Sequence, residues 1–210
     1  MKKYFEFVKN AIVISITCSM LIACDDENTA APITGDFYPM KTNATWQYIS
    51  EWSCDFAPCN SDDPNWFQYV WGDTVIQGMT YTVVRSVYDV AKIARRAGNK
   101  YYEWHIYDNK EYLFLDAGLS PGKSWIKNED KYWKTEVFAE QPLSVLQVKD
   151  KEYHDVVVMR EETSYCDGTY SYLYVVHRYY AKDVGEVLSV SPAVPNTYFS
   201  GTKFSLYKYE

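Results

Sequence analysis

Most of the chain consists of short strand-length segments, each followed by residues that favour a tight turn. The segments are rich in Tyr, Val, Thr, Trp and Ile, which suit a half-buried pleated surface. No long stretch repeats its apolar residues with the 3.6-residue period of a helix, and the weak helical candidate is 142–148. The pattern predicts an all-β fold: an antiparallel meander of about ten strands that forms a sandwich or a half-open barrel.

Three dipeptides between strand-like runs predict two-residue hairpin turns, because their residues tolerate the positive φ values that such turns need. The dipeptides are Gln77-Gly78, Gly98-Asn99 and Asp167-Gly168. In the hairpin around Asp167-Gly168 both strand faces mix apolar and charged residues. The sequence therefore does not decide which face of that hairpin points inward.

One face of the Gly98-Asn99 hairpin is strongly charged. Lys92, Arg96, Glu103 and His105 share it if the strands alternate regularly. Such a face can be interpreted as an acid–base cluster. Opposite charges across neighbouring strands also pair without any function, so we expect a solvated outer face.

The first 23 residues have the features of a bacterial lipoprotein signal peptide. Lys2, Lys3 and Lys9 precede the uncharged run 11–23. That run is too short for a transmembrane helix of about 20 residues but typical of a signal-peptide core. It ends in LIAC, which resembles the lipobox of bacterial lipoproteins. In that family the cysteine thiol, here that of Cys24, receives diacylglycerol and the peptide is cut just before it, so residues 1–23 would be removed.

Residues 24–35 are predicted to form an acidic, flexible tether that leads to a single all-β domain, 36–210. Three acidic residues, 25–27, directly follow the lipidated position. An acidic cluster there resembles a surface-export signal of Bacteroidota, and an aspartate resembles an inner-membrane retention signal of enteric bacteria; a solvated spacer also fits. We expect a lipid-anchored protein of the bacterial cell envelope, on the outer membrane (periplasmic or surface face) rather than the inner membrane.

The net charge argues against nucleic acid as a partner. It is −7 for the whole chain; after cleavage, eighteen Lys and Arg face twenty-seven Asp and Glu, which gives −9. Phosphate binding needs clustered basic residues instead. The expected partners are the membrane, through the lipid, and a glycan, lipid or protein ligand.

Three segments of the domain carry recognisable motifs. Segment 37–48 reads FYPMKTNATWQY, 72–81 reads GDTVIQGMTY, and 180–187 reads YAKDVGEV. They resemble the YFPLKxGNxWxY, GDTxIxGKxY and YAKGVGxV segments of a family of uncharacterised β-rich bacterial envelope lipoproteins, many from Bacteroidota. The chain departs from this pattern at Asn43-Ala44 and Met79, where the family has Gly-Asn and Lys. The resemblance implies an antiparallel β domain, such as the half-barrel of lipoprotein carriers, and no known activity.

Cys54, Cys59 and Cys166 remain in the mature domain once Cys24 takes the lipid. The envelope permits disulfides, and closing the short loop between Cys54 and Cys59 would contribute about 2 kcal/mol in the chain-entropy model. We expect this pair to be bridged and Cys166 to be free. The alternatives are a bridge from Cys166 to one of them, or a three-thiolate metal site, for which the CxxC spacing and a nearby His are missing.

Aromatic residues are in excess: seven Trp, 21 Tyr and nine Phe make up 18% of the chain. Tyr and Trp suit half-exposed sheets because each carries a polar tip, and this explains most of them. The functional alternative is an aromatic surface that stacks on sugar rings or holds an apolar ligand. The candidate ligand-binding residues are Trp52, Trp66 and Trp71, close to the Cys54–Cys59 loop.

The sequence carries neither an HExxH nor a GxSxG signature. We therefore predict no catalytic residue, cofactor or metal, and favour a non-enzymatic binding or structural role. One alternative is a carrier that holds a hydrophobic ligand in a β half-barrel. The other is a hydrolase with an unrecognised site, which would need His105, His154 or His177 to meet a carboxylate in a cleft.

Overall fold

The computed structural model describes residues 34–54, 57–60, 65–86, 89–167, 171–192 and 201–210, and only the backbone at 52–54, 57–60 and 172. These residues form fourteen β-strands. Among them there is no helix long and apolar enough to cross a membrane. The predicted signal peptide and most of the tether, including Cys24, lie outside the described residues.

The strands follow one another with short connections. They are β1 (Thr45–Cys54), β2 (Ala57–Asn60), β3 (Trp66–Ile76), β4 (Met79–Ser86), β5 (Val90–Ala97), β6 (Lys100–His105), β7 (Lys110–Asp116), β8 (Ser124–Glu129), β9 (Trp133–Ala139), β10 (Leu143–Val148), β11 (Lys151–Cys166), β12 (Ser171–Ala181), β13 (Gly185–Ser191) and β14 (Thr202–Tyr209).

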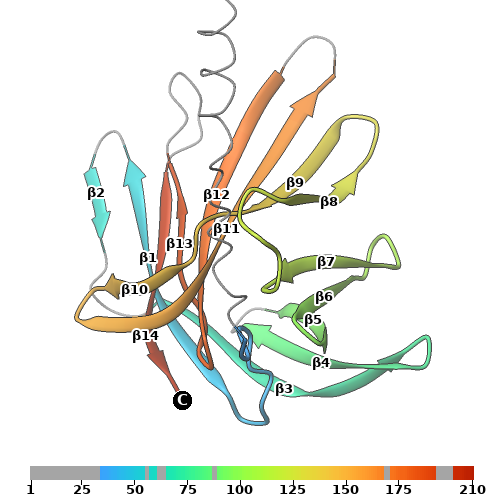
Figure 1. Cartoon of the computed structure of the whole chain (residues 1–210), viewed down its shortest axis with the longest axis horizontal. Coiled ribbons are helices and arrows are strands. Elements are labelled where there is room, and N and C mark those ends of the chain that lie inside the picture. The colour runs from blue at the N-terminus through green and yellow to red at the C-terminus, as the bar shows by residue number, and fades with distance from the viewer. Residues whose placement is uncertain (1–33, 55–56, 61–64, 87–88, 168–170, 193–200) are drawn as a thin grey trace, which may run out of the picture. The chain divides into compact units, whose positions relative to one another are not determined.

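All fourteen strands belong to one antiparallel sheet (Figure 1), so the all-β prediction is confirmed in its half-open barrel form. The main path runs β7-β6-β5-β4-β3-β1-β14-β13-β12-β11-β9-β8, while β2 pairs with β1 and β10 with the first part of β11. The strand number exceeds the expected ten. The helical prediction for 142–148 is wrong, because this segment is paired as β10 with the start of β11.

Two of the three predicted turns have the expected form. Gln77 and Gly78 both have positive φ, and Ile76 pairs with Met79 across them. Ala97 pairs with Lys100 across the turn at 98–99. Local turn chemistry is sufficient to fix these hairpins.

The third predicted turn is wrong in length. Cys166 pairs with Ser171, so four residues, 167–170, connect β11 and β12 instead of the Asp167-Gly168 pair alone. The strong preference of Asp-Gly for a two-residue turn is overridden by the register of this long hairpin, which continues over eleven paired positions.

The sheet curls until its two end strands, β7 and β8, meet (Figure 1). No ladder joins them among the described residues, but the Trp125 indole N–H on β8 donates to the Leu113 carbonyl on β7 at 2.9 Å. On the far side of the sheet the first strand pairs with the last, and the Thr45 N–H donates to the Glu210 carbonyl at 2.8 Å. The result is a nearly closed, barrel-like sheet.

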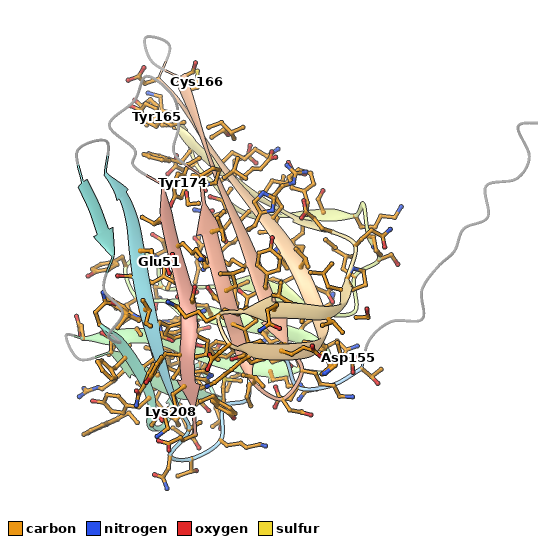
Figure 2. All side chains as sticks on the ribbon, turned by 90° about the vertical axis from the view of Figure 1, so that its left-hand side faces the viewer. Glu51, Asp155, Tyr165, Cys166, Tyr174 and Lys208 are labelled. Carbon is orange, nitrogen blue, oxygen red and sulfur yellow. The ribbon has the colours of Figure 1, made fainter. Side chains whose placement is uncertain are left out.

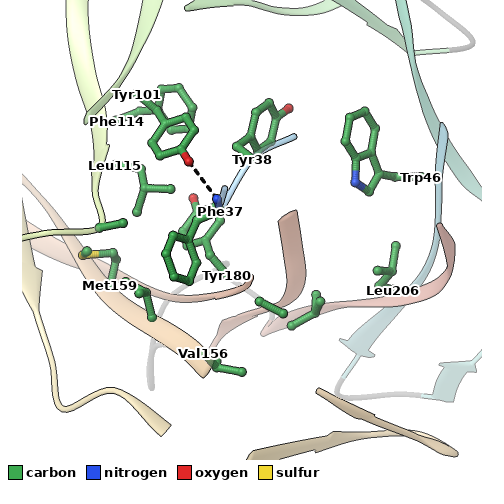
Figure 3. Close-up of a cluster of buried hydrophobic side chains, with 14 of the residues drawn as sticks. Phe37, Tyr38, Trp46, Tyr101, Phe114, Leu115, Val156, Met159, Tyr180 and Leu206 are labelled. Atoms are coloured by element: carbon green, nitrogen blue, oxygen red, sulfur yellow. Dashed lines mark hydrogen bonds between the residues drawn. The ribbon is translucent and has the colours of Figure 1, made fainter. Parts of the chain in front are cut away.

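The core lies inside this curve and includes the segment before β1. Phe37 and Tyr38 are buried there, and the Phe37 N–H donates to the Tyr101 hydroxyl at 2.7 Å (Figure 3). The Tyr101 hydroxyl in turn donates to Asp36 Oδ1 at 3.0 Å. Tyr38 stacks on Trp46, with ring centroids 5.7 Å apart. Part of the aromatic excess of the sequence therefore fills the interior of the sheet.

Candidate functional site: a charged cavity inside the sheet

A cavity of about 400 Å³ lies within the curve of the sheet, and its wall mixes aromatic rings with charged side chains. This volume is in the usual range for small-molecule sites. The wall is formed by Tyr38, Tyr48, Trp66, Gln68, Lys92, Glu103, Phe114, Lys127, Glu161, Tyr174, Val176, Arg178, Tyr180, Glu186, Ser189, Ser191, Thr202 and Phe204.

Strand alternation explains why these residues face inward. On β12 the cavity wall takes every second residue, from Tyr174 to Tyr180. Glu161 on β11 pairs directly with Val176, so both lie on the same face of the sheet. The structure thereby settles the orientation of the hairpin whose two faces looked alike in the sequence: the face with Tyr174, Val176 and Arg178 points inward.

The charged face of the β5–β6 hairpin is not wholly solvated, and the prediction of an outer face is wrong for two of its four residues. Lys92 and Glu103 line the cavity. Their shared orientation follows from the pairing of Ala94, which is fully buried, with Glu103. Arg96 and His105 are exposed. The sheet curls around this face, which strand alternation alone cannot reveal.

Four charged side chains of the wall form a continuous ionic network. The Glu161 carboxylate contacts Lys127 Nζ on β8 and Arg178 Nε on β12, each at 3.4 Å. Arg178 Nη1 continues the network to Glu186 Oε1 on β13 at 3.1 Å. Two cations meet two carboxylates, so the network is neutral as a whole.

Electrostatics keep the two central members of this network, Glu161 and Arg178, ionised. Burial by itself raises the pKa of the Glu161 carboxyl, but Lys127 and Arg178 outweigh burial and hold the pKa below its ordinary value. Burial likewise opposes the charge of Arg178, yet Glu186 and Glu161 raise its pKa further. The wall therefore presents fixed charges to the cavity at neutral pH.

Lys92 has a different environment. Its Nζ lies 4.0 Å from the centre of the Phe114 ring and 4.8 Å from that of Tyr38, as in cation–π contacts. Burial lowers the pKa of the Lys92 ammonium, although the charge of Glu103 partly opposes this. The ammonium is thus held over two aromatic rings rather than against a carboxylate.

Several uncharged polar groups complete the wall. Burial raises the pKa of the Tyr38, Tyr48 and Tyr180 phenols, so they remain protonated donors. Tyr48 donates to the Glu186 carbonyl at 3.1 Å. Ser191 is only 2% exposed, and its hydroxyl has no hydrogen-bond partner within the described part of the chain. A buried hydroxyl in that state costs free energy unless a ligand or water meets it.

Of the three tryptophans that the sequence predicts as ligand-binding residues, Trp66 and Trp71 lie on opposite faces of β3. Trp66 lines the cavity. Trp71 is 62% exposed on the other face of β3, where Arg85 packs 4.5 Å from its ring. The Trp52 backbone pairs with Cys59 in the β1–β2 hairpin, but its side chain lies outside the described residues.

The cysteine predictions stay open. The β1–β2 register pairs Cys54 with Ala57 and Cys59 with Trp52, and the side chains of both cysteines lie outside the described residues. Cys166 is exposed and carries a free thiol at the end of β11, next to Tyr165 (Figure 2).

Each histidine meets a carboxylate, but none is among the described residues that line the cavity. The contacts are His105–Asp108 at 2.8 Å, His154–Glu152 at 3.1 Å and His177–Glu140 at 3.3 Å. Of these carboxylates, Glu140 borders a second hollow, an open groove on the opposite face of β11 and β12. Among the described residues that line this groove, the hydroxyl belongs to Tyr179, whose pKa is raised by burial and by Glu140, which makes it a poor nucleophile.

Sequence reasoning identified one wall residue as functional, Trp66, and missed the charged ones. The signal was present in part: charged residues interrupt strands that are otherwise apolar or aromatic, as in Met159-Arg160-Glu161 and Val176-His177-Arg178. That pattern leaves open which charges point inward, because the answer depends on how the whole sheet curves.

Comparisons with known proteins bear on the fold. No known family profile and no curated protein matches the chain. One similar solved structure is that of a protein from Bacteroides fragilis that is inferred to be exported and has a YmcC-like fold. Its TM-score is 0.49, and it is 10% identical over 84% of this chain and 99% of its own. Another similar structure is that of an inferred lipoprotein from Parabacteroides distasonis. Its TM-score is 0.43, and it is 8% identical over 85% of this chain and 100% of its own. At these identities and TM-scores neither structure indicates a family or a function for this chain.

Proposed function

We propose that the chain is a lipid-anchored binding protein of the bacterial envelope, on the outer membrane, which holds a small polar ligand in the cavity of its barrel without chemical change. The observation that carries the proposal is the cavity wall, where rings and ionised groups surround a space of about 400 Å³. The N-terminal signal pattern supports the lipid anchor at Cys24.

A purely structural barrel would not need such a wall. Small barrels fill their interiors with packed side chains, mostly apolar. Here three cations and three carboxylates border the cavity, together with the Ser191 hydroxyl, which has no hydrogen-bond partner among the described residues. Desolvated charges of this kind cost folding free energy, and proteins retain such features chiefly at functional sites.

The same wall argues against a carrier of acyl chains. An apolar chain in this cavity would strip water from six charged groups and return no hydrogen bonds. The rings of Trp66, Phe114 and Phe204 suit a ligand with one flat or apolar part beside its polar groups. A binding role is also supported by the position of the histidines, which stand away from the cavity.

Intrinsic tryptophan fluorescence tests this function. Titration of the full-length protein with neutral sugars, fatty acids and amino acids should give a saturable change with at least one polar class. Trp66→Phe should remove most of that change, whereas the matched control Trp71→Phe should retain it, because Trp71 lies on the other face of β3. A response that survives Trp66→Phe, or silence across all three classes, would contradict the proposal.

A further inference from the structure

The six charges of the cavity wall divide into two sets. Lys127, Glu161, Arg178 and Glu186 neutralise one another through contacts of 3.1–3.4 Å. Lys92 and Glu103 are outside this network. Within the described part of the chain, neither of them makes an ion pair or a side-chain hydrogen bond.

Lys92 and Glu103 lie on adjacent strands and face the same space. Ala94 pairs with Glu103, and Lys92 is the next inward residue along β5, so the two positions are diagonal neighbours. The Lys92 ammonium nevertheless rests over Phe114 and Tyr38 instead of closing onto the carboxylate. The cavity thus presents one open positive and one open negative group side by side.

Charge balance then limits what can fill the cavity. The six ionised side chains sum to zero, so a ligand with a single net charge would leave one charge of the wall uncompensated. A neutral sugar would leave Lys92 and Glu103 with no charged group of the ligand to contact, so that each would have only the more distant charges of the wall. A ligand with one anionic and one cationic group would complement both, and charged partners across an interface give specificity of this kind.

We propose that the cavity selects a zwitterion, whose anionic group contacts the Lys92 ammonium and whose ammonium group contacts the Glu103 carboxylate. A free amino acid, a short peptide and a phosphoethanolamine group share this chemistry. The Phe114 ring lies next to the Lys92 ammonium, and Trp66 is another ring of the same wall; these rings would receive an apolar side chain of the ligand. This proposal rests on the binding function proposed above and specifies its ligand class.

Calorimetric titration of the full-length protein tests the proposal with L-phenylalanine and glycyl-L-phenylalanine. The comparison probes are N-acetyl-L-phenylalanine, which keeps only the anion, and L-phenylalanine amide, which keeps only the cation. Each should bind at least tenfold more weakly than the parent zwitterion. Glycerophosphoethanolamine, whose phosphodiester carries a single negative charge beside the ammonium group, tells whether a headgroup or an amino acid is the source, and glucose is the neutral comparison.

Variants assign the two charges. Lys92→Met should weaken zwitterion binding at least tenfold and remove the preference for L-phenylalanine over its amide. Glu103→Gln should remove the preference over the N-acetyl derivative. The matched controls Lys110→Met and Glu129→Gln change exposed residues and should bind as the wild type does.

The outcomes separate this proposal from the binding function. Equal binding of the zwitterion and its two singly charged derivatives would overturn the zwitterion proposal, as would Trp66-dependent binding of glucose alone; in either case the binding function stands. If no probe binds and the fluorescence titration also gives no change, both the zwitterion proposal and the proposed binding function are refuted. The ligand derivatives test the wild-type protein, so this distinction does not depend on how the variants fold.

Discussion

Glu161 lies between two cations of the cavity wall, and this position determines how its carboxylate titrates. Lys127 and Arg178 both contact it, and the side chain is only 15% exposed. Its pKa in the folded protein therefore lies below the value of 4.5 that applies when the chain is unfolded. At a pH between the folded and the unfolded pKa, the Glu161 carboxyl is protonated in the unfolded chain and ionised in the folded protein. The stability that Glu161 contributes is therefore fully present above pH 4.5 and is lost as the pH falls through the folded pKa.

Glu161→Gln should remove this pH dependence and destabilise the protein at neutral pH. We expect a loss of about 1–3 kcal/mol in the free energy of unfolding at pH 7, because Lys127 is left without its partner and Arg178 keeps only Glu186. Urea unfolding between pH 3 and pH 7 should show a shallower acid limb than in the wild type. Glu129→Gln, at an exposed position, is the control and should change neither quantity. An unchanged acid limb in Glu161→Gln would contradict the assignment.

The residue scale is also where prediction from the sequence was weakest. Nothing in the sequence distinguishes Trp66 from Trp71, yet they lie on opposite faces of β3. The sequence predicts a solvated face for Lys92 and Glu103, but both border the cavity. Strand alternation fixes which residues share a face, and the closure of the sheet decides which face is inside. Only the alternation along a strand is determined by the local sequence.

At the scale of elements, tight turns could be predicted where a positive φ is required. Gln77-Gly78 is an example, and Gly185, at the start of β13, is a second position with positive φ. Gly185 has an additional constraint: a Cβ there would lie 3.1 Å from Trp46 Nε1, the indole nitrogen that donates to the Val184 carbonyl at 2.7 Å. The turn and the buried tryptophan are therefore coupled.

Gly185→Ala should be more destabilising than Gly78→Ala. Both glycines have positive φ, which costs an L-residue about 1–2 kcal/mol, but a Cβ at Gly78 would meet open space. We expect Gly185→Ala to lose about 1 kcal/mol more, since Trp46 must shift from its hydrogen bond. Chemical denaturation of the two variants measures the difference. Equal losses in the free energy of unfolding would show that the close contact with Trp46 does not contribute to the cost of Gly185→Ala.

The β1–β2 hairpin carries the predicted Cys54–Cys59 disulfide. The envelope is oxidising, and a bridge across this short connection should form during export. Peptide mapping under non-reducing conditions should recover the two cysteines in one bridged peptide, while Cys166 reacts with an alkylating agent without prior reduction because it is exposed. Two alkylated thiols at 54 and 59 in protein from the envelope would refute the bridge.

At the scale of the molecule, fold class followed from the sequence but curvature did not. Segment lengths, β-branched and aromatic residues and turn pairs predict one antiparallel meander. They do not say whether the strands form one sheet or two, because that depends on which distant strands meet. Here the first strand pairs with the last, and the Trp125–Leu113 hydrogen bond joins the free ends of the sheet. These long-range contacts enclose the cavity.

The whole protein is predicted to act from a membrane surface, and Cys24 is the residue on which this depends. The basic start, the uncharged run and the LIAC segment together predict lipidation there. Two or three acyl chains, at about 0.8 kcal/mol per buried CH₂, exceed the marginal anchoring of a single myristoyl group. Cys24→Ala should therefore abolish incorporation of labelled palmitate and release the protein from the membrane fraction. Cys18→Ala is the matched control, because Cys18 lies within the segment that would be cleaved and should leave labelling unchanged; palmitate retained in Cys24→Ala would disprove the anchor.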